Sequence, residues 1–403
     1  MKKRILFFAL TLFAISGSLA AQGLTFSGIL DSSVSLRAGA GDAPAFMFGV
    51  EEYANLRMQA KIRDKAMFYG ALNLIAAAGD SAQAIAQMEA LTKARGYAPF
   101  GISPSSFAGG ENFIAGIELE RLYLRLYGEY LDFDGGLLRL PFGYGQVWGP
   151  SDFLNPRNPL IPDARPRAVL GAGLSWYPED TLKLLGFGAA PKNPFASGGE
   201  GGLVGVSMDK HWNKASLQLL YAFESPKPGS DRGIHRAGMS VKADLILGLV
   251  TDLLYTYNDE VENKLDGLSF SMGADYSFFD GDLIVLAEYL YNGKTSSTAF
   301  NSGENIFGRL NEQYLYTGLT WRFNDFTNAG AAMLFCIDDI SFTPILSLNH
   351  DLFQGATLTV SAQIPMDRDL FNDDGNRGEL GPIPPGGTSG TYFNLNAKLR
   401  LRF

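Results

Sequence analysis

The sequence contains one cysteine and three histidines among its 403 residues. A single cysteine cannot form an internal disulfide, so crosslinks do not hold this fold together, and Cys336 is interpreted as a small buried strand residue. The sequence also has no cluster of cysteine and histidine of the kind that binds zinc. We therefore expect no metal and no cofactor.

Long apolar runs are missing as well. After residue 22, every apolar run is interrupted well before the ~18 residues that a membrane-spanning helix requires, which excludes a helical membrane protein. At the start of the chain, Lys2, Lys3 and Arg4 precede an apolar stretch over 5–15 and a run of small residues. These are the three parts of a secretory signal peptide. We expect residues 1–22 to be a cleaved export signal and residues 23–403 to be the mature chain.

The sequence contains fewer basic than acidic residues. Without the three basic residues of the predicted signal, 30 Lys and Arg stand against 42 Asp and Glu. Nucleic-acid binding depends on a basic face that neutralises phosphates. The composition therefore argues against nucleic acid as a partner.

What the sequence does contain is alternation with a period of two residues. Between 393 and 403 the odd positions are apolar and the even positions are polar, which predicts a strand with one apolar and one wetted face. The same alternation recurs at 268–278 and 356–364. Eighteen such segments are predicted, and they begin near Leu24, Ala45, Lys65, Asn112, Tyr130, Ala168, Thr181, Gly201, Lys214, Arg232, Leu249, Leu268, Asp282, Gln313, Phe326, Ile340, Gly355 and Thr391.

The links between these segments alternate between tight and mostly long. This pattern predicts an all-β fold: a single closed antiparallel transmembrane β-barrel of about 18 strands (16–18), with short periplasmic turns and long extracellular loops. Closure is needed because an open sheet edge in lipid leaves backbone groups unpaired. A soluble β-sandwich is the alternative, but its outward faces would be polar where these carry Phe, Tyr and Leu.

Phe403, an aromatic residue that ends an alternating strand, resembles the terminal signature of outer-membrane barrels. Together with the signal peptide and the Gly-x-Gly-x-Val-Trp-Gly-Pro-Ser-Asp-x-x-Asn-Pro run that starts at Gly143, it makes the chain resemble a Gram-negative porin-like barrel of unspecified subfamily. The resemblance implies location in the outer membrane, contact with its lipid, and insertion by the assembly machinery through the strand ending at Phe403. Such pores are often homotrimers, a hypothesis for which the sequence shows no subunit interface.

Residues 143–167 are the most distinctive loop. Five prolines fix backbone φ angles and remove donors, so the loop is predicted to be stiff. It resembles the constriction loop that folds into a porin and narrows the pore, which assigns pore-lining roles to Trp148, Asp152 and Asp163. The alternative is a rigid cap that packs on the rim.

The alternation of side chains along each predicted strand places a set of basic residues on the lumen face. They are Arg57, Arg121, Arg125, Arg139, Lys398 and Arg400. Because the first and last strands are neighbours in a closed barrel, these residues are predicted to form one positive arc. Asp152 and Asp163 opposite the arc would create a transverse field that orders polar solutes. The alternative is that the cations are solvated lumen residues paired with Glu118, Glu120 or Asp134.

Three local features complete the prediction. The parity slips between Glu120 and Arg121, which predicts a bulge. Asp80 followed three residues later by Gln83 predicts a short helix over 80–94, as a decorated surface loop or a lid. In the acidic loop 367–379, a calcium-loop alignment puts Leu370 where the first acidic ligand belongs, so calcium is not expected.

An enzyme is not expected either. His211 and His350 fall at predicted periplasmic turns, and His235 has no nucleophile in a recognisable arrangement. The predicted function is an outer-membrane porin, a passive diffusion channel for small hydrophilic solutes or ions. The alternative is a surface-exposed structural or adhesin-type barrel with an occluded lumen. A transporter of hydrophobic solutes or an energised transporter would need an N-terminal plug, for which no length is left before the first strand.

Overall fold

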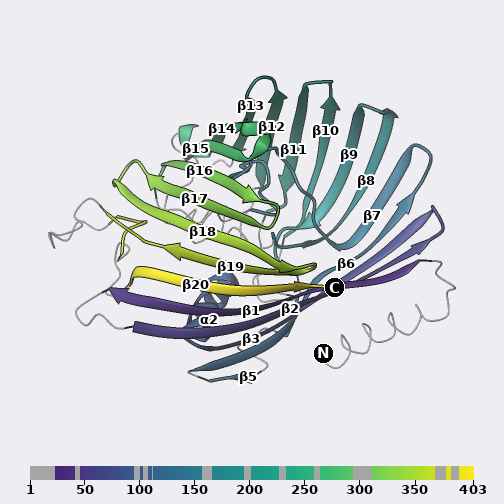
Figure 1. Cartoon of the computed structure of the whole chain (residues 1–403). Helices are drawn as coiled ribbons and strands as arrows, with labels where there is room; N and C mark the ends of the chain where they lie inside the picture. Colours follow the sequence, from purple (N-terminus) through teal and green to yellow (C-terminus); the bar gives the residue numbers. More distant parts are fainter. Residues whose placement is uncertain are drawn as a thin grey trace.

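The computed structural model describes residues 23–40, 46–94, 100–102, 108–110, 112–156, 166–194, 201–226, 233–257, 264–293, 311–367, 378–382 and 390–403 (Figure 1). The predicted signal peptide, Asp163 and most of the acidic loop 367–379 lie outside these residues. Among the described residues, no helix is long and apolar enough to cross a membrane.

Eighteen strands form the wall of a closed antiparallel barrel. They are β1 (Leu24–Ala40), β2 (Phe46–Ile62), β3 (Ala66–Gly79), β6 (Phe113–Tyr127), β7 (Leu131–Leu138), β8 (Val169–Glu179), β9 (Leu182–Ala190), β10 (Leu203–His211), β11 (Ala215–Glu224), β12 (Ile234–Asp244), β13 (Gly248–Tyr257), β14 (Leu268–Phe278), β15 (Leu283–Asn292), β16 (Gln313–Asn324), β17 (Thr327–Cys336), β18 (Ser341–Phe353), β19 (Ala356–Gln363) and β20 (Gly390–Arg402). Every predicted start lies within two residues of the observed one. The predicted fold class and strand number are therefore confirmed.

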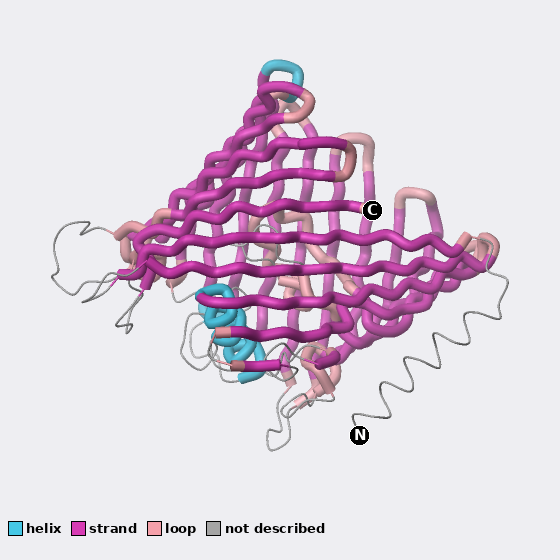
Figure 2. The backbone as a smooth tube through the Cα atoms, turned by 60° about the horizontal axis from the view of Figure 1, so that its bottom comes forward, coloured by secondary structure: helices cyan, strands magenta, loops and turns pink. Residues whose placement is uncertain are grey.

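Short elements complete the sheet and its turns. Two-residue strands β4 (Gly101–Ile102) and β5 (Ala108–Gly109) pair with β6. Two 3-10 turns, η1 (Lys264–Gly267) and η2 (Phe279–Gly281), flank β14. Figure 2 shows the tilted strands of the wall and the single described helix, α2 (Asp80–Ala94), against them.

The barrel closes where β1 pairs with β20. The register runs from Ile29 opposite Arg402 to Ala40 opposite Gly390, with one irregularity after Ala38. Gly28 and Phe403 exchange backbone hydrogen bonds of 2.7 and 3.2 Å, and a side chain on Gly28 would collide with the ring of Phe403. The terminal residue is thus built into the seam, so no strand edge is left open to lipid at this point.

The two faces of the wall differ as the alternation predicts. On β1, Phe26 is 66% exposed on the outside, whereas Asp31 on the other face is buried and paired within the lumen. Exposed aromatic side chains concentrate near strand ends, with Trp176 and Trp321 near one rim and Tyr257 near the other. An apolar band between aromatic girdles is the outer surface expected of a barrel in a membrane.

The predicted bulge and helix are both present. Ala71 pairs with Arg121 and Leu72 with Leu119, so Glu120 is the extra residue of a β-bulge. Helix α2 begins at the predicted Asp80. Arg37, on the lumen face of β1, forms an ion pair with Asp80. The helix therefore starts inside the mouth of the barrel.

Because neighbouring residues of the wall face lipid and lumen in turn, two adjacent substitutions on β16 should change stability by unequal amounts. Leu319 is exposed on the outer face, and Thr320 lines the lumen cavity. Leu319→Arg should lower the free energy of unfolding in lipid vesicles by ~2–4 kcal/mol, because it places a charge near the middle of the apolar band. Thr320→Arg should change it by less than ~1 kcal/mol. Denaturant titration of the refolded proteins measures both values, and equal losses would contradict the assigned facing.

Candidate functional site

The loop between β7 and β8, residues 139–168, is here named the inner loop; its described parts are 139–156 and 166–168. It leaves β7 and turns into the lumen, where lumen-facing side chains of distant strands bind its backbone. The N–H of Gly143 donates to Oε1 of Gln218 on β11 at 2.6 Å. The hydroxyl of Ser151 donates to Oδ1 of Asp252 on β13 at 2.5 Å. The loop thus crosses to the wall on the far side of the lumen.

Glu288 on β15 is the strongest of these anchors. Its carboxylate accepts hydrogen bonds from three successive backbone N–H groups, those of Gln146 and Val147 at 3.0 Å and that of Trp148 at 2.8 Å. The residue is 1% exposed. Charge-assisted bonds to successive N–H groups are strong, and they fix the backbone of this segment in one conformation.

Apolar contacts hold the inner loop along the same wall. One cluster joins loop residues Phe142, Phe153 and Leu154 to Leu185, Phe187, Leu220 and Leu254 of the wall. A second joins Val147 and Trp148 to Leu290, Tyr314, Leu334, Cys336 and Leu380. Burial also raises the pKa of the loop hydroxyl of Tyr144 to about 12, so it stays neutral. The loop forms a second layer inside the barrel.

This packing corrects the roles predicted for two loop residues. The ring of Trp148 is 1% exposed and meets Tyr316 edge-on at 6.3 Å, so it lies between loop and wall. The side chain of Asp152 is buried within the loop, and its Oδ1 accepts the N–H of Phe142 at 3.4 Å. Burial removes the apolar ring of Trp148 from water, and a backbone N–H bond of the loop replaces part of the hydration of the Asp152 carboxylate. Gln146 is the described loop residue that borders the open space instead.

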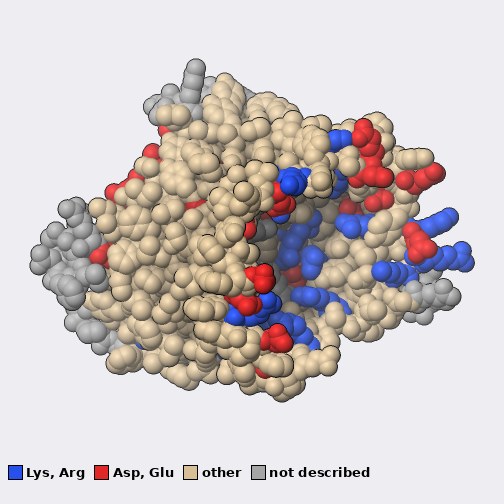
Figure 3. All heavy atoms as spheres, turned by 45° about the horizontal axis from the view of Figure 1, so that its top comes forward, with Lys and Arg blue, Asp and Glu red and all other residues tan. Residues whose placement is uncertain are grey.

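A cavity of about 960 Å³ remains beside the inner loop. On the side of β1, β2, β3 and β6 it is lined by Asp31, Glu51, Tyr53, Asn73 and Glu118. On the side of β18 to β20 most lining residues carry uncharged amide or hydroxyl groups: Ser347, Asn349, Thr359, Ser361, Gln363, Asn394 and Asn396. The charged residues Lys398 and Arg400 of β20 complete this side. Lys and Arg gather in a hollow of the molecule with Asp and Glu beside them (Figure 3).

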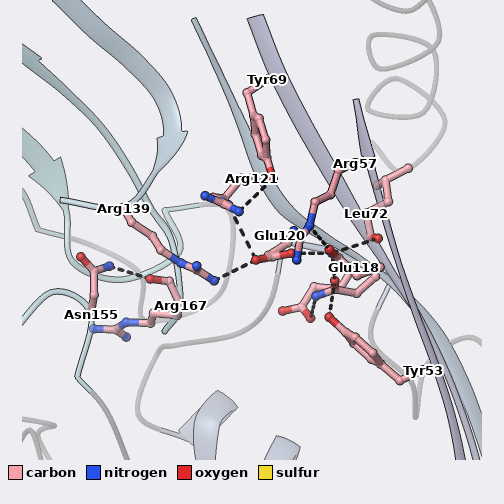
Figure 4. A network of polar contacts seen from close by, with 12 residues as sticks. Tyr53, Arg57, Tyr69, Leu72, Glu118, Glu120, Arg121, Arg139, Asn155 and Arg167 are labelled. Carbon is pink, nitrogen blue, oxygen red and sulfur yellow. Dashed lines mark hydrogen bonds and ion pairs between the residues drawn. The ribbon is translucent and has the colours of Figure 1, made fainter. Parts of the chain in front are cut away.

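Glu120 is the centre of a polar network on the lumen wall (Figure 4). It accepts Nη2 of Arg139 at 2.8 Å and Nδ2 of Asn55 at 2.5 Å, and Nε of Arg121 lies 3.7 Å away. The bulge produces this arrangement, because the extra residue lets Glu120 and Arg121 both point inward. Arg57 reaches the network through Asn55, whose Oδ1 accepts its Nε at 2.5 Å.

The other predicted arc cations also have acidic neighbours. They are Arg125 with Asp134 at 2.5 and 3.1 Å, Arg400 with Asp31 at 2.8 and 2.7 Å, and Lys398, which interacts electrostatically with Glu51. The cations therefore form a row of charge pairs in place of a bare positive arc. Arg57 differs, since the partner that its guanidinium reaches among the described residues is a neutral amide.

The sequence prediction missed the wall residues that hold the loop. Glu288 lies between Leu286 and Leu290 on the lumen face of β15, and Asp252 has apolar neighbours of the same kind on β13. On a lumen face that is otherwise polar, apolar residues two positions before and after an acid indicate that another part of the chain covers the face there. Such flanking residues could have identified Glu288 and Asp252 as acids buried beneath the inner loop.

No metal-binding group was found in the described part of the chain: it brings together no three His, Cys, Asp or Glu side chains that could hold an ion. The three histidines bond to hydroxyls: His211 to Ser216, His235 to Tyr221 and His350 to Thr327.

No protein-family model matches the sequence, and no curated protein matches it. Solved structures do match. OccAB4 of Acinetobacter baumannii superposes with a TM-score of 0.54 at 10% identity, covering 95% of this chain and 99% of that one. The outer membrane protein OpdK of Pseudomonas aeruginosa gives 0.53 at 8% identity, with 95% and 99% covered. OccAB1 of Acinetobacter baumannii gives 0.52 at 10%, with 95% and 98% covered. The fold is that of outer-membrane porins.

Within this porin fold, the anchoring role of Glu288 can be measured directly. Glu288→Ala should release residues 146–148 from the wall, so single-channel current in a planar bilayer should become noisier and its mean amplitude should change. Asp282→Asn, at the exposed residue directly before the same strand, is the control and should leave the current unchanged. An unaltered, quiet current from Glu288→Ala would show that the carboxylate does not hold the loop.

Proposed function

We propose that this chain is an outer-membrane porin, a passive diffusion channel for small hydrophilic solutes. The observation that supports it best is the cavity beside the inner loop, whose lining is mostly polar and charged, with an apolar part on β15 to β18, within a barrel whose outer face is apolar. A barrel of eighteen strands is wide enough to hold water. Such an interior favours hydrated solutes, and such an exterior favours lipid.

The two sides of the cavity suggest how solutes pass. Amide and hydroxyl groups of β18 to β20 exchange hydrogen bonds with a solute as it loses water, and neutral groups do this for solutes of either charge. On the opposite side, paired charges such as Arg400 with Asp31 largely cancel at a distance. The selectivity between ions therefore rests on the few charges without a close acidic partner, among which Arg57 stands out.

A structural or adhesin-type barrel with an occluded lumen is the other candidate. It requires the inner loop to fill the lumen, whereas the described residues of the loop pack along one wall and about 960 Å³ of space remains beside them. The channel is the better account of this arrangement.

The partners follow from the same proposal. The exposed apolar band contacts outer-membrane lipid, and β20 with its terminal Phe403 is the segment that the assembly machinery would recognise. Association of copies of the chain, such as a homotrimer, is also proposed.

Reversal potentials in a salt gradient test the channel and its charges together. The refolded wild-type protein should conduct, and Arg57→Glu should shift the reversal potential toward cation preference, because it replaces a lumen cation by an anion. Lys210→Glu makes the same change of charge at the periplasmic end of β10, where Lys210 pairs with Glu179, and should have little effect. A protein that inserts as a folded barrel but does not conduct would overturn the proposal.

A further inference from the structure

Two rows of lumen residues run from strand to strand around the cavity between β15 and β20. The strand registers place the members of the first row directly opposite one another: Leu286, Gly318, Ala332, Ile345, Gln363 and Asn394. The second row lies two residues nearer the short turns and runs in the same way from Ile284 of β15 to Asn396 of β20. All members of both rows line the cavity.

Both rows change in chemistry along their length. On β15 to β17 the residues are mostly apolar or glycine, and on β18 to β20 they mostly carry amide or hydroxyl groups; Thr320 and Ile345 are the exceptions. Neighbouring strands are ~4.8 Å apart, and the wall of a barrel curves around its lumen. The apolar part and the amide part therefore border the same space from different sides.

The apolar part has a flat surface. The ring of Tyr316 lies over Gly318, where an added Cβ would be 3.0 Å from the ring, and the edge-on contact with Trp148 holds it there. Tyr316 borders the cavity, and Leu286 and Ala332 line it on the neighbouring strands. A flat surface of this kind removes the flat C–H face of a ring-shaped solute from water.

The amide part has unused hydrogen-bonding groups. Within the described chain, the side chains of four cavity residues have no hydrogen-bond partner, and these are Ser347, Ser361, Asn394 and Asn396. An amide or a hydroxyl both donates and accepts, and so does a hydroxyl of a solute. A carboxylate or an ether oxygen only accepts, and an ammonium group only donates. A solute with several hydroxyls therefore uses these groups most completely.

The charges of the cavity do not favour an anionic solute over a neutral one. Arg400 is paired with Asp31 at 2.7 Å, and Lys398 interacts with Glu51. Counted over the whole lining, three acids stand against these two bases, the third acid being Glu118. The lining thus carries a small net negative charge, which repels a carboxylate and leaves an uncharged solute unaffected.

We propose that the passage selects uncharged polyhydroxylated solutes, such as saccharides and sugar alcohols. The apolar part on β15 to β17 contacts the C–H face of the sugar, while the amide part on β18 to β20 exchanges hydrogen bonds with its hydroxyls. A volume of about 960 Å³ is near the upper end of the ~300–1,000 Å³ of small-molecule sites, so a sugar fits with part of its water. This inference rests on the proposed channel function, because it names the solute of that channel.

Block of the KCl current by added solutes tests the selection. Glucose, glucuronate and triethylene glycol are added in turn to the refolded protein in a planar bilayer. Glucose should reduce the current in a saturable way, and its half-blocking concentration should be at least ~10-fold lower than that of either other solute. Glucuronate has the same ring with a carboxylate, and triethylene glycol is uncharged but has ether oxygens in place of most hydroxyls.

Substitutions in the amide part locate the contact. Asn394→Leu with Asn396→Leu keeps the side-chain size, removes both amides and should raise the half-blocking concentration of glucose at least ~10-fold. Asn213→Leu makes the same change in the exposed turn between β10 and β11 and should leave it unchanged. Ser347→Ala with Ser361→Ala removes two hydroxyls with less effect on folding and should raise it at least ~3-fold.

The outcomes separate this inference from the channel itself. Equal half-blocking concentrations for the three solutes, or a glucose block that the Ser347→Ala and Ser361→Ala pair leaves unchanged, would overturn the selection of polyhydroxylated solutes in a protein that still conducts KCl. A barrel that inserts but carries no KCl current would overturn the proposed function, and this inference with it.

Discussion

Inside a membrane, a backbone N–H or C=O has no water to bond with, and the pairing of β1 with β20 removes the last two open edges of this sheet. Once the sheet is closed, the alternation of side chains has only one consequence: every second residue meets lipid and the rest meet an enclosed space. The seam also uses the end of the chain, since Phe403 bonds to the backbone of Gly28 and covers it with its ring. All other features of the molecule are defined by which side of this wall they occupy.

A closed wall of eighteen strands encloses more space than its own side chains fill, and the inner loop divides that space. The loop is held against strands between β9 and β17. Three of its successive backbone N–H groups donate to Glu288, its Ser151 hydroxyl donates to Asp252, and two apolar clusters join it to the wall. The passage lies beside the loop, where paired charges and neutral amides line it together with residues of β15 to β17 such as Leu286 and Thr320. On the outer face, Glu52 of β2 is a carboxylate whose chain neighbours Glu51 and Tyr53 line the lumen, and it accepts a hydrogen bond from the hydroxyl of Ser32.

Local patterns were sufficient for several features, since each depends on neighbours in sequence: alternation predicted the barrel, the strand number and the bulge at Glu120, and the spacing of Asp80 and Gln83 predicted the helix. The predicted lumen cations also project inward, but alternation could not decide between a bare arc and the alternative of pairing with nearby acids. Arg125 with Asp134 and Arg139 with Glu120 follow that alternative, and Arg400 pairs with Asp31, which was not anticipated. The inward fold of the inner loop was predicted only from its resemblance to the constriction loop of porins. The burial of Trp148 depends on contacts with residues 140 or more positions away, which no local pattern encodes.

The central claim is that the inner loop covers one half of the lumen wall and leaves the other half wet. Two lumen-face serines distinguish these halves: Ser33 borders the cavity, and Ser271 is buried behind the loop, with its hydroxyl bonded to the carbonyl of Trp148 at 3.3 Å. Each is replaced by cysteine, and a charged, water-soluble thiol reagent is added while the current through a planar bilayer is recorded. The account predicts rapid loss of current for Ser33→Cys and no reaction for Ser271→Cys. Equally fast reaction at both positions would contradict it.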